Sequence, residues 1–199
     1  MKNYIFGFIT LIIILTMYSC KGKLMGEFYL SSEMKAQIPF KGGEIIYLTD
    51  SNGETYSLKA GEKYNEVFEY PMCNSCKDYS IYEREWIIVS DETYKMLLKM
   101  SSGTDMYSFS IEYSINGIGF DCSFRSPLSQ DNLRINELYY DSLVVSNKTY
   151  YNVFSDTLTH IGSIGIDPYP VRCYYSTEFG IVKISFSDST SWELENIEW

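Results

Sequence analysis

Cysteines are the residues with the most chemical potential in this sequence, which contains five of them. Cys73 and Cys76 form a Cys-x-x-Cys pair, Cys122 and Cys173 stand alone, and Cys20 follows an apolar N-terminal run. A redox pair needs a low-pKa thiolate, usually at a helix N-terminus in a βαβ setting, and zinc knuckles usually come in close pairs. Neither context surrounds Cys73 and Cys76, so disulfide formation is the chemistry that this pattern favours.

The four cysteines beyond Cys20 allow three disulfide pairings in an oxidising compartment. Cys122 and Cys173 each lie on the apolar face of an expected strand, whereas Cys73 and Cys76 share a loop after Pro71. This placement favours Cys73–Cys76 together with Cys122–Cys173, and the other two pairings remain open. Each bridge is expected to stabilise the fold by about 2–4 kcal/mol, the shorter loop giving less.

Other catalytic groups are sparse. The single histidine, His160, lies in Thr-His-Ile-Gly-Ser-Ile-Gly, which lacks the first glycine of a nucleophile elbow. Glu83 and Glu85 share one face of an expected strand; two carboxylates can hydrolyse glycosides, but we expect these two to be solvated on a wet face. No phosphate loop, zinc-protease pattern or calcium loop occurs. We therefore expect no enzymatic activity, no cofactor and no metal.

Charge and aromatic content narrow the class of partner. Sixteen basic against 26 acidic residues give a net charge of −10, and no basic cluster provides the footprint of a nucleic-acid binder. Tyrosine is abundant, at 19 of 199 residues, and suits contact surfaces for proteins and glycans. Strand alternation sends one ring of each tyrosine pair outward: Tyr139-Tyr140, Tyr150-Tyr151 and Tyr174-Tyr175.

The N-terminus has the layout of an export signal. Lys2 precedes an apolar run over residues 4–18, which is shorter than the ~20 residues that span a bilayer. Met17-Tyr18-Ser19-Cys20 resembles the lipobox of bacterial lipoproteins, with Met and Tyr in place of the preferred Leu and small residue. The resemblance implies cleavage before Cys20 and acylation of its sulfur and amino group. An uncleaved anchor helix, or a secreted protein with an ordinary thiol at Cys20, are the alternatives.

The lipobox interpretation predicts three parts of the chain: a signal peptide (1–19), a lipidated tether (20–24) and one domain (25–199). Lys21-Gly22-Lys23 after the anchor differs from the acidic stretch of surface lipoproteins in the Bacteroidota. The expected location is therefore the cell envelope, at the outer membrane, with the periplasmic face favoured over the cell surface. The acidic domain itself is not expected to dock directly on anionic lipid.

Period-two patterns dominate the rest of the chain. Alternation over residues 108–115, the turn Asn116-Gly117 and alternation over 120–125 predict a β-hairpin, and similar signals recur near both ends. The fold class is therefore mainly antiparallel β, as a sandwich or a partly open barrel. At most one short helix is expected, near 91–100, where Tyr94, Leu97 and Leu98 follow helical spacing; a strand is the alternative there.

Two further resemblances concern exported Bacteroidota proteins. Tyr174-Tyr175, Gly180-Ile181-Val182-Lys183 and Trp192-Glu193-Leu194 are similar to the C-terminal hairpin of small lipoproteins in this group, and imply a fold but no activity. Three Asp-Ser/Thr motifs resemble O-glycosylation sites of exported proteins in the same group, and mark Ser142, Thr157 and Ser189.

Two functions follow from these observations. The first is a membrane-tethered envelope lipoprotein whose β-domain binds a protein or glycan partner without catalysis. The alternative is a periplasmic carrier or chaperone that holds an apolar ligand in a β half-barrel. A filled core with an exposed aromatic patch favours the first function, and a sizeable apolar cavity favours the second.

Overall fold

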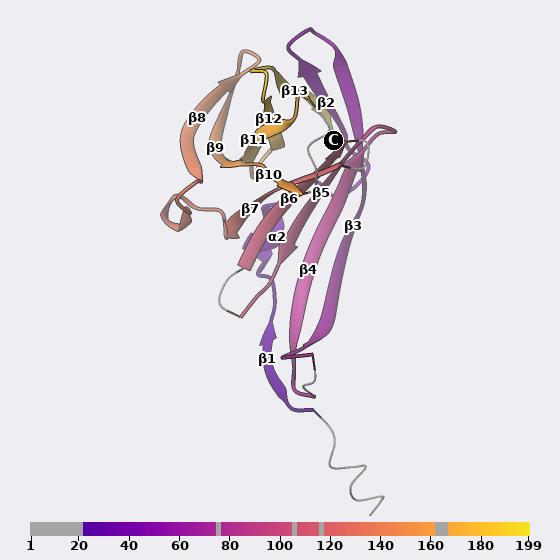
Figure 1. The fold of residues 1–199 in the computed structure, drawn as a ribbon, viewed down its shortest axis with the longest axis vertical. Coiled ribbons are helices and arrows are strands. Elements are labelled where there is room, and N and C mark those ends of the chain that lie inside the picture. The colour runs from indigo at the N-terminus through magenta and orange to yellow at the C-terminus, as the bar shows by residue number, and fades with distance from the viewer. Residues whose placement is uncertain (1–21, 75–76, 105–106, 116–117, 162–166) are drawn as a thin grey trace, which may run out of the picture.

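The computed structural model describes residues 22–74, 77–104, 107–115, 118–161 and 167–199, and most of them belong to one sheet (Figure 1). Its strands are β1 (Leu24–Phe28), β2 (Ile45–Asp50), β3 (Thr55–Pro71), β4 (Tyr79–Ser90), β5 (Tyr94–Ser101), β6 (Tyr107–Ile115), β7 (Ile118–Ser126), β8 (Leu138–Val145), β9 (Lys148–Thr157), β10 (Thr159–Ile161), β11 (Pro170–Ser176), β12 (Gly180–Phe186) and β13 (Ser191–Glu198). The helical elements in these ranges are the single turns α2 (Ser32–Ala36) and η1 (Gln130–Asn132).

The sheet curls into a half-barrel. Its strand order is β10-β7-β6-β5-β4-β3-β2-β13-β12-β11-β9-β8, with antiparallel neighbours throughout, and β1 adds a parallel pairing on β4. β10 continues from β9 across Leu158 and yet pairs with β7, so the chain joins the two sides of the curl. The expected mainly β class and partly open barrel are confirmed.

Residues 91–100 form a turn and a strand rather than a helix. The Asp91 carboxylate accepts hydrogen bonds from the backbone N–H groups of Thr93 and Tyr94, which closes a tight turn between β4 and β5. Met96 and Leu98 then point into the core at a spacing of two. Pairing with β4 and β6 on both sides satisfies the backbone, and this outweighs the local helical spacing.

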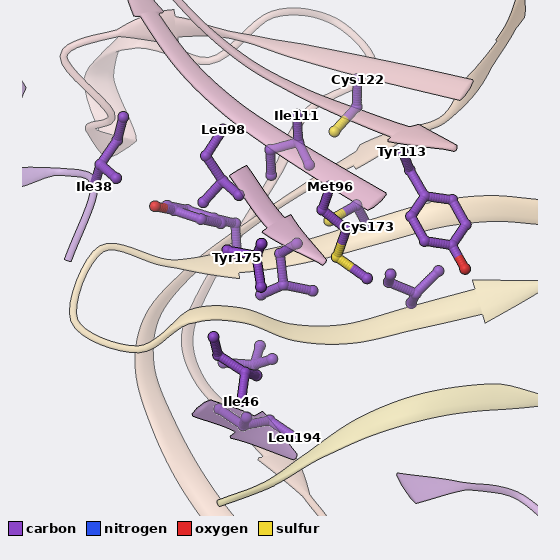
Figure 2. Packing of buried hydrophobic residues seen from close by; sticks show 14 of the residues in the cluster. Ile38, Ile46, Met96, Leu98, Ile111, Tyr113, Cys122, Cys173, Tyr175 and Leu194 are labelled. Carbon is purple, nitrogen blue, oxygen red and sulfur yellow. The ribbon is translucent and has the colours of Figure 1, made fainter. Parts of the chain in front are cut away.

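The concave face of the sheet encloses the core, and Figure 2 shows its central side chains. Tyr175 is fully buried, packs 4.6 Å from Phe109 between ring centroids, and donates a hydrogen bond from its hydroxyl to the Gln37 carbonyl at 2.7 Å. The apolar cavity between strands β2, β3, β4, β5 and β12 has a volume of only about 10 Å³. The interior around it is filled by side chains.

Gly180 begins β12 in a left-handed conformation, with φ of 78°. A Cβ added there would lie 2.5 Å from Cζ of the buried Phe40. Gly180→Ala is therefore expected to lower the free energy of unfolding by about 2–4 kcal/mol, through backbone strain and overpacking. Urea denaturation measures the change, with Gly53→Ala as the control.

Gly53 separates the two causes because it also has a positive φ, 86°, but no heavy atom lies within 4 Å of its added Cβ. Gly53→Ala should thus lose only the strain part, about 1 kcal/mol. Equal losses in the two variants would contradict the packing argument at Gly180.

The β3–β4 hairpin is the longest feature of the fold. β3 has 17 residues and β4 has 12, and their far end extends beyond the half-barrel, where β1 runs beside β4 (Figure 1). At ~3.3 Å per residue, β3 covers roughly 50 Å from the β2–β3 turn to the hairpin tip. The two ends of this strand are therefore well separated surfaces.

Candidate binding site

The structure separates the cysteines into two groups. Cys73 is disulfide-bonded, which excludes its pairing with Cys122 or Cys173 here, since both of these are free thiols. Cys20 and Cys76 lie outside the described residues. The predicted bridge between Cys122 and Cys173 is not formed in this structure, and it stays a prediction.

Cys122 and Cys173 nevertheless meet in the core. They come from β7 and β11, on the two sides of the curl, and both thiols are buried (Figure 2). A hydrogen bond with Cys173 and burial both raise the pKa of the Cys122 thiol well above its ordinary value. Cys122 therefore has little thiolate for nucleophilic or redox catalysis.

Glu83 and Glu85 are not on a wet face, and that prediction is wrong. Both are buried, because the alternation that turns Ile87 and Val89 into the core continues down β4. Lysines from neighbouring elements neutralise them: Lys35 Nζ lies 2.5 Å from Glu83, and Lys63 Nζ lies 2.8 Å from Glu85. These two carboxylates link β4 to α2 and β3. Neither of them lines the pocket described below.

The remaining predicted residues are dispersed. The backbone of His160 belongs to β10, and its side chain lies outside the described part of the structure. Of the three glycosylation candidates, Ser142 is exposed on β8, Thr157 is half-buried at the end of β9, and Ser189 is exposed in the β12–β13 turn. Only Ser189 has the exposed turn setting that glycosylation favours, and its neighbours on both sides line the pocket described next.

A pocket of about 400 Å³ opens at the mouth of the half-barrel, at the end of the β2–β3 turn. Its aromatic wall consists of Tyr56, Tyr94, Phe186 and Trp192, the last inward-facing layer of β3, β5, β12 and β13. Its polar rim consists of Asp50, Ser51, Asn52, Asp167, Asp188 and Thr190, with Pro168 beside them. The volume falls in the range of small-ligand sites, and barrel mouths commonly contain them.

The aromatic wall is held by mutual ring contacts. Tyr56 stacks on Trp192 with centroids 4.8 Å apart, and Tyr94 meets the same indole edge-on at 4.6 Å. Phe186 packs against Trp192 with the ring centroids 5.5 Å apart. These contacts fix the rings before any ligand arrives, which reduces the entropy lost on binding.

Hydrogen bonds favour the charged form of two rim carboxylates, Asp188 and Asp50. Hydrogen bonds from the Thr190 hydroxyl and backbone lower the pKa of Asp188. Desolvation alone would raise the pKa of Asp50, but hydrogen bonds from the backbone of Glu54 and Asn52 outweigh it and lower the value. The three acids face no lysine or arginine within the described lining, so the pocket has a negative potential.

Both tyrosines of the wall stay neutral. Desolvation raises the pKa of Tyr56, and a hydrogen bond to Glu54 at 3.0 Å adds to it. Desolvation and Asp91 raise the pKa of Tyr94. One layer deeper, Tyr113 contacts Trp192 edge-on at 6.0 Å, and its buried hydroxyl has no hydrogen-bond partner among the described residues. The wall therefore offers neutral aromatic rings, and the Tyr56 hydroxyl already donates its hydrogen bond to Glu54.

This pocket was not predicted from the sequence. Asp50-Ser51-Asn52-Gly53 and Asp188-Ser189 are typical turn sequences, and Trp192 alternates with polar neighbours, but nothing local indicates that the two turns share one rim. Its residues are contributed by segments more than one hundred positions apart, which only the closure of β13 onto β2 brings together. Of the three tyrosine pairs, only Tyr151 has an exposed ring, on β9. Its partner Tyr150 and Tyr175 are buried, and the remaining three, Tyr139, Tyr140 and Tyr174, are half-buried against the core. None of the six lines the pocket.

The described residues include no cluster of histidine, cysteine and acidic side chains suited to a metal ion. Across the same ranges, no helix has the length and hydropathy needed to cross a membrane. No protein-family model, curated protein or solved structure matches this chain. The site geometry must therefore support any functional proposal by itself.

Proposed function

We propose that this chain is a membrane-tethered envelope lipoprotein that binds a glycan at the mouth of its half-barrel, without catalysis. The observation that carries this proposal is the 400 Å³ pocket with a preformed aromatic wall and a rim of hydrogen-bond acceptors. The tether is the acylated Cys20 that the lipobox-like sequence implies.

The pocket chemistry suits a sugar. The apolar C–H faces of a pyranose pack on aromatic rings, which tyrosine and tryptophan provide together with a polar edge. Carboxylates accept strong hydrogen bonds from hydroxyl groups, and Asp188 at the rim uses a single oxygen, Oδ1, for both of its hydrogen bonds from Thr190. The negative rim favours neutral or amino sugars over acidic ones.

The filled interior supports this function over the carrier alternative. An acyl chain or similar apolar ligand needs a cavity of several hundred Å³, whereas the apolar cavity between β2, β3, β4, β5 and β12 has a volume of about 10 Å³. Cys122, Tyr113 and Tyr175 occupy the central volume instead (Figure 2).

The rim acids also support binding rather than hydrolysis. A glycosidase needs one carboxylic acid with a raised pKa that protonates the leaving group. The pKa values of Asp50 and Asp188 are instead both lowered, so these groups stay ionised as acceptors. This pair of ionised acceptors suits the binding of sugar hydroxyl groups rather than cleavage of a glycosidic bond.

Tyr94→Ala tests the proposal. The variant removes one of the four rings of the aromatic wall. A glycan panel first identifies a glycan that the wild-type domain binds. The affinity of the variant for this glycan is expected to be lower by at least about tenfold. Titration calorimetry measures the affinity, and thermal melting confirms that the variant is folded.

Tyr151→Ala is the matched control, because Tyr151 is an exposed tyrosine on β9 that does not line the pocket. Its affinity should equal that of the wild type. An unchanged affinity in Tyr94→Ala, or a panel in which no glycan binds, would overturn the proposal.

A further inference from the structure

Exposed apolar side chains gather at the far end of the β3–β4 hairpin. We call Leu24, Met25, Tyr70 and Met72 the tip patch; the exposed fractions of the last three are 52%, 60% and 50%. They come from two segments, β1 and the end of β3, which lie on either side of β4 because β1 pairs with β4 from Leu24 onward and β4 pairs with β3 up to Pro71. Single exposed apolar residues are ordinary, but a cluster at one extremity indicates a contact surface.

Aromatic rings extend this patch along the outer face of the hairpin. Tyr82 on β4 stacks with Phe28 of β1 at 5.3 Å and meets Tyr70 edge-on at 6.3 Å. Phe68 packs on the same Tyr82 ring, and Arg84 lies 4.9 Å from the Phe68 centroid. Rings with one apolar and one polar end are typical of the zone where a bilayer meets water.

The residue that precedes β1, Lys23, is also bound at the hairpin tip. The backbone N–H of Lys23 donates to the Asp78 carboxylate at 2.8 Å, and the N–H of Tyr79 donates to the Lys23 carbonyl. Lys23 is therefore attached to the loop at the tip. Cys20 is three residues earlier, and three extended residues reach at most about 11 Å.

We propose that the tip patch inserts into the interfacial layer of the bilayer that holds the acylated Cys20. This inference rests on the lipid tether of the proposed function. An anchor within about 11 Å of the tip brings the tip patch to the lipid surface, where its exposed apolar groups leave water. The β3–β4 hairpin then acts as a stalk that holds the glycan pocket roughly 50 Å from the membrane.

The contact is apolar rather than electrostatic. The described charged residues at the tip are Lys23 and Lys77 against Glu27, Glu69 and Asp78, which is two positive and three negative charges, or −1. Such a surface gains nothing from anionic lipid. Insertion should therefore need the acyl chains for recruitment and should persist at high salt.

A fluorescent label at the tip tests this inference. The full-length chain is produced with its signal peptide, purified in lipidated form and reconstituted into vesicles of phosphatidylethanolamine and phosphatidylglycerol. Tyr70→Cys carries an environment-sensitive thiol label; Tyr70 is 50 residues from Cys20 in sequence, so its depth reports the fold and not the anchor. Cys122 and Cys173 are buried and stay unlabelled in the folded domain.

Val144→Cys is the matched control, since Val144 is 68% exposed on β8, away from the hairpin tip (Figure 1). We expect lipids that carry a quencher near the headgroup to quench the label at position 70 several-fold more than the label at 144. Thermal melting confirms that both labelled variants are folded.

Two outcomes overturn the inference, and they are distinguishable. If the chain floats with the vesicles but the two labels are quenched equally, the tether holds and the inserted tip is wrong. If the lipid-processed chain fails to float, the tether of the proposed function is wrong as well. Glycan affinity, measured separately through Tyr94→Ala, does not depend on either result.

Discussion

Glu83→Ala is expected to lower the free energy of unfolding by about 3–5 kcal/mol, which is typical when one partner of a buried ion pair is removed. The Glu83 carboxylate accepts hydrogen bonds from Lys35 Nζ at 2.5 Å, Asn65 Nδ2 at 2.7 Å and the Leu30 backbone at 2.8 Å. Alanine leaves all three donors without this acceptor. Because these donors come from β3 and from the segment around α2, the loss should loosen the attachment of the stalk.

Urea denaturation measures this effect, and Glu66→Ala is the control. Glu66 pairs with Arg84 at 2.6 Å one residue further along the same two strands, but both side chains are more than 40% exposed. Exposed pairs contribute between about 0 and 1 kcal/mol, so the control should remain close to the wild type. Similar losses in both variants would show that Glu83 is not a special attachment point.

Acid sensitivity gives Glu83 a second signature. Burial alone would raise the pKa of its carboxyl, but the hydrogen bonds from Lys35, Asn65 and Leu30 outweigh burial and hold it below the ordinary value of 4.5. A group whose pKa is lowered by folding contributes stability above its unfolded pKa, and this contribution is lost as pH falls through the folded pKa. Glu83→Gln should therefore be less stable than the wild type at pH 7, and the gap should narrow below pH 4.5. A gap that is constant with pH would contradict the charge argument.

Oxidation of Cys122 and Cys173 to a disulfide is expected to stabilise the domain by about 4 kcal/mol, because the bond closes a loop of about 50 residues. The two thiols are already hydrogen-bonded in the core, so the disulfide would connect β7 to β11 on opposite sides of the curled sheet. Two thiols lose two electrons and two protons in this step, which a disulfide oxidant in the medium accepts.

Timing distinguishes this bond from a surface disulfide. The raised pKa of Cys122 and its burial suppress the thiolate that attacks an oxidant, so the folded reduced domain should resist oxidation. Refolding from denaturant with oxidised glutathione should form the bond while the thiols are exposed. Thiol counting in denaturant and thermal melting follow both states, and Cys122→Ala with Cys173→Ala is the variant without the bond. An oxidised domain that melts no higher than this variant would contradict the expectation.

Local patterns predicted the strands but not their arrangement. The alternation over 108–115 and 120–125 identified β6 and β7 because one face of each strand meets the core and the other meets solvent. The same alternation rule placed Glu83 and Glu85 on the solvent face, because it assigns every carboxylate to that face; both side chains are in fact buried. Only the packing of α2 and β3 against β4 brought Lys35 and Lys63 to these carboxylates. The lysine charges offset the free-energy cost of burying Glu83 and Glu85.

The segment at 91–100 shows how far a local preference extends. Its helical spacing was real, but the strands on both sides offered a complete hydrogen-bond ladder, and a ten-residue helix is marginal alone. Cysteine placement is a similar case. The sequence placed Cys122 and Cys173 on apolar faces, and the curl of the sheet then decided that these faces oppose each other.

The amino-acid sequence by itself determined the β class and the expectation of a lipid tether, because both depend on neighbours within a few residues. The tertiary structure alone decided the pocket and the tip patch. The pocket needs β13 beside β2, and the tip patch needs β1 beside β4. Such long-range pairings are selected by burial of the whole sheet face, an energy that no short stretch of sequence contains.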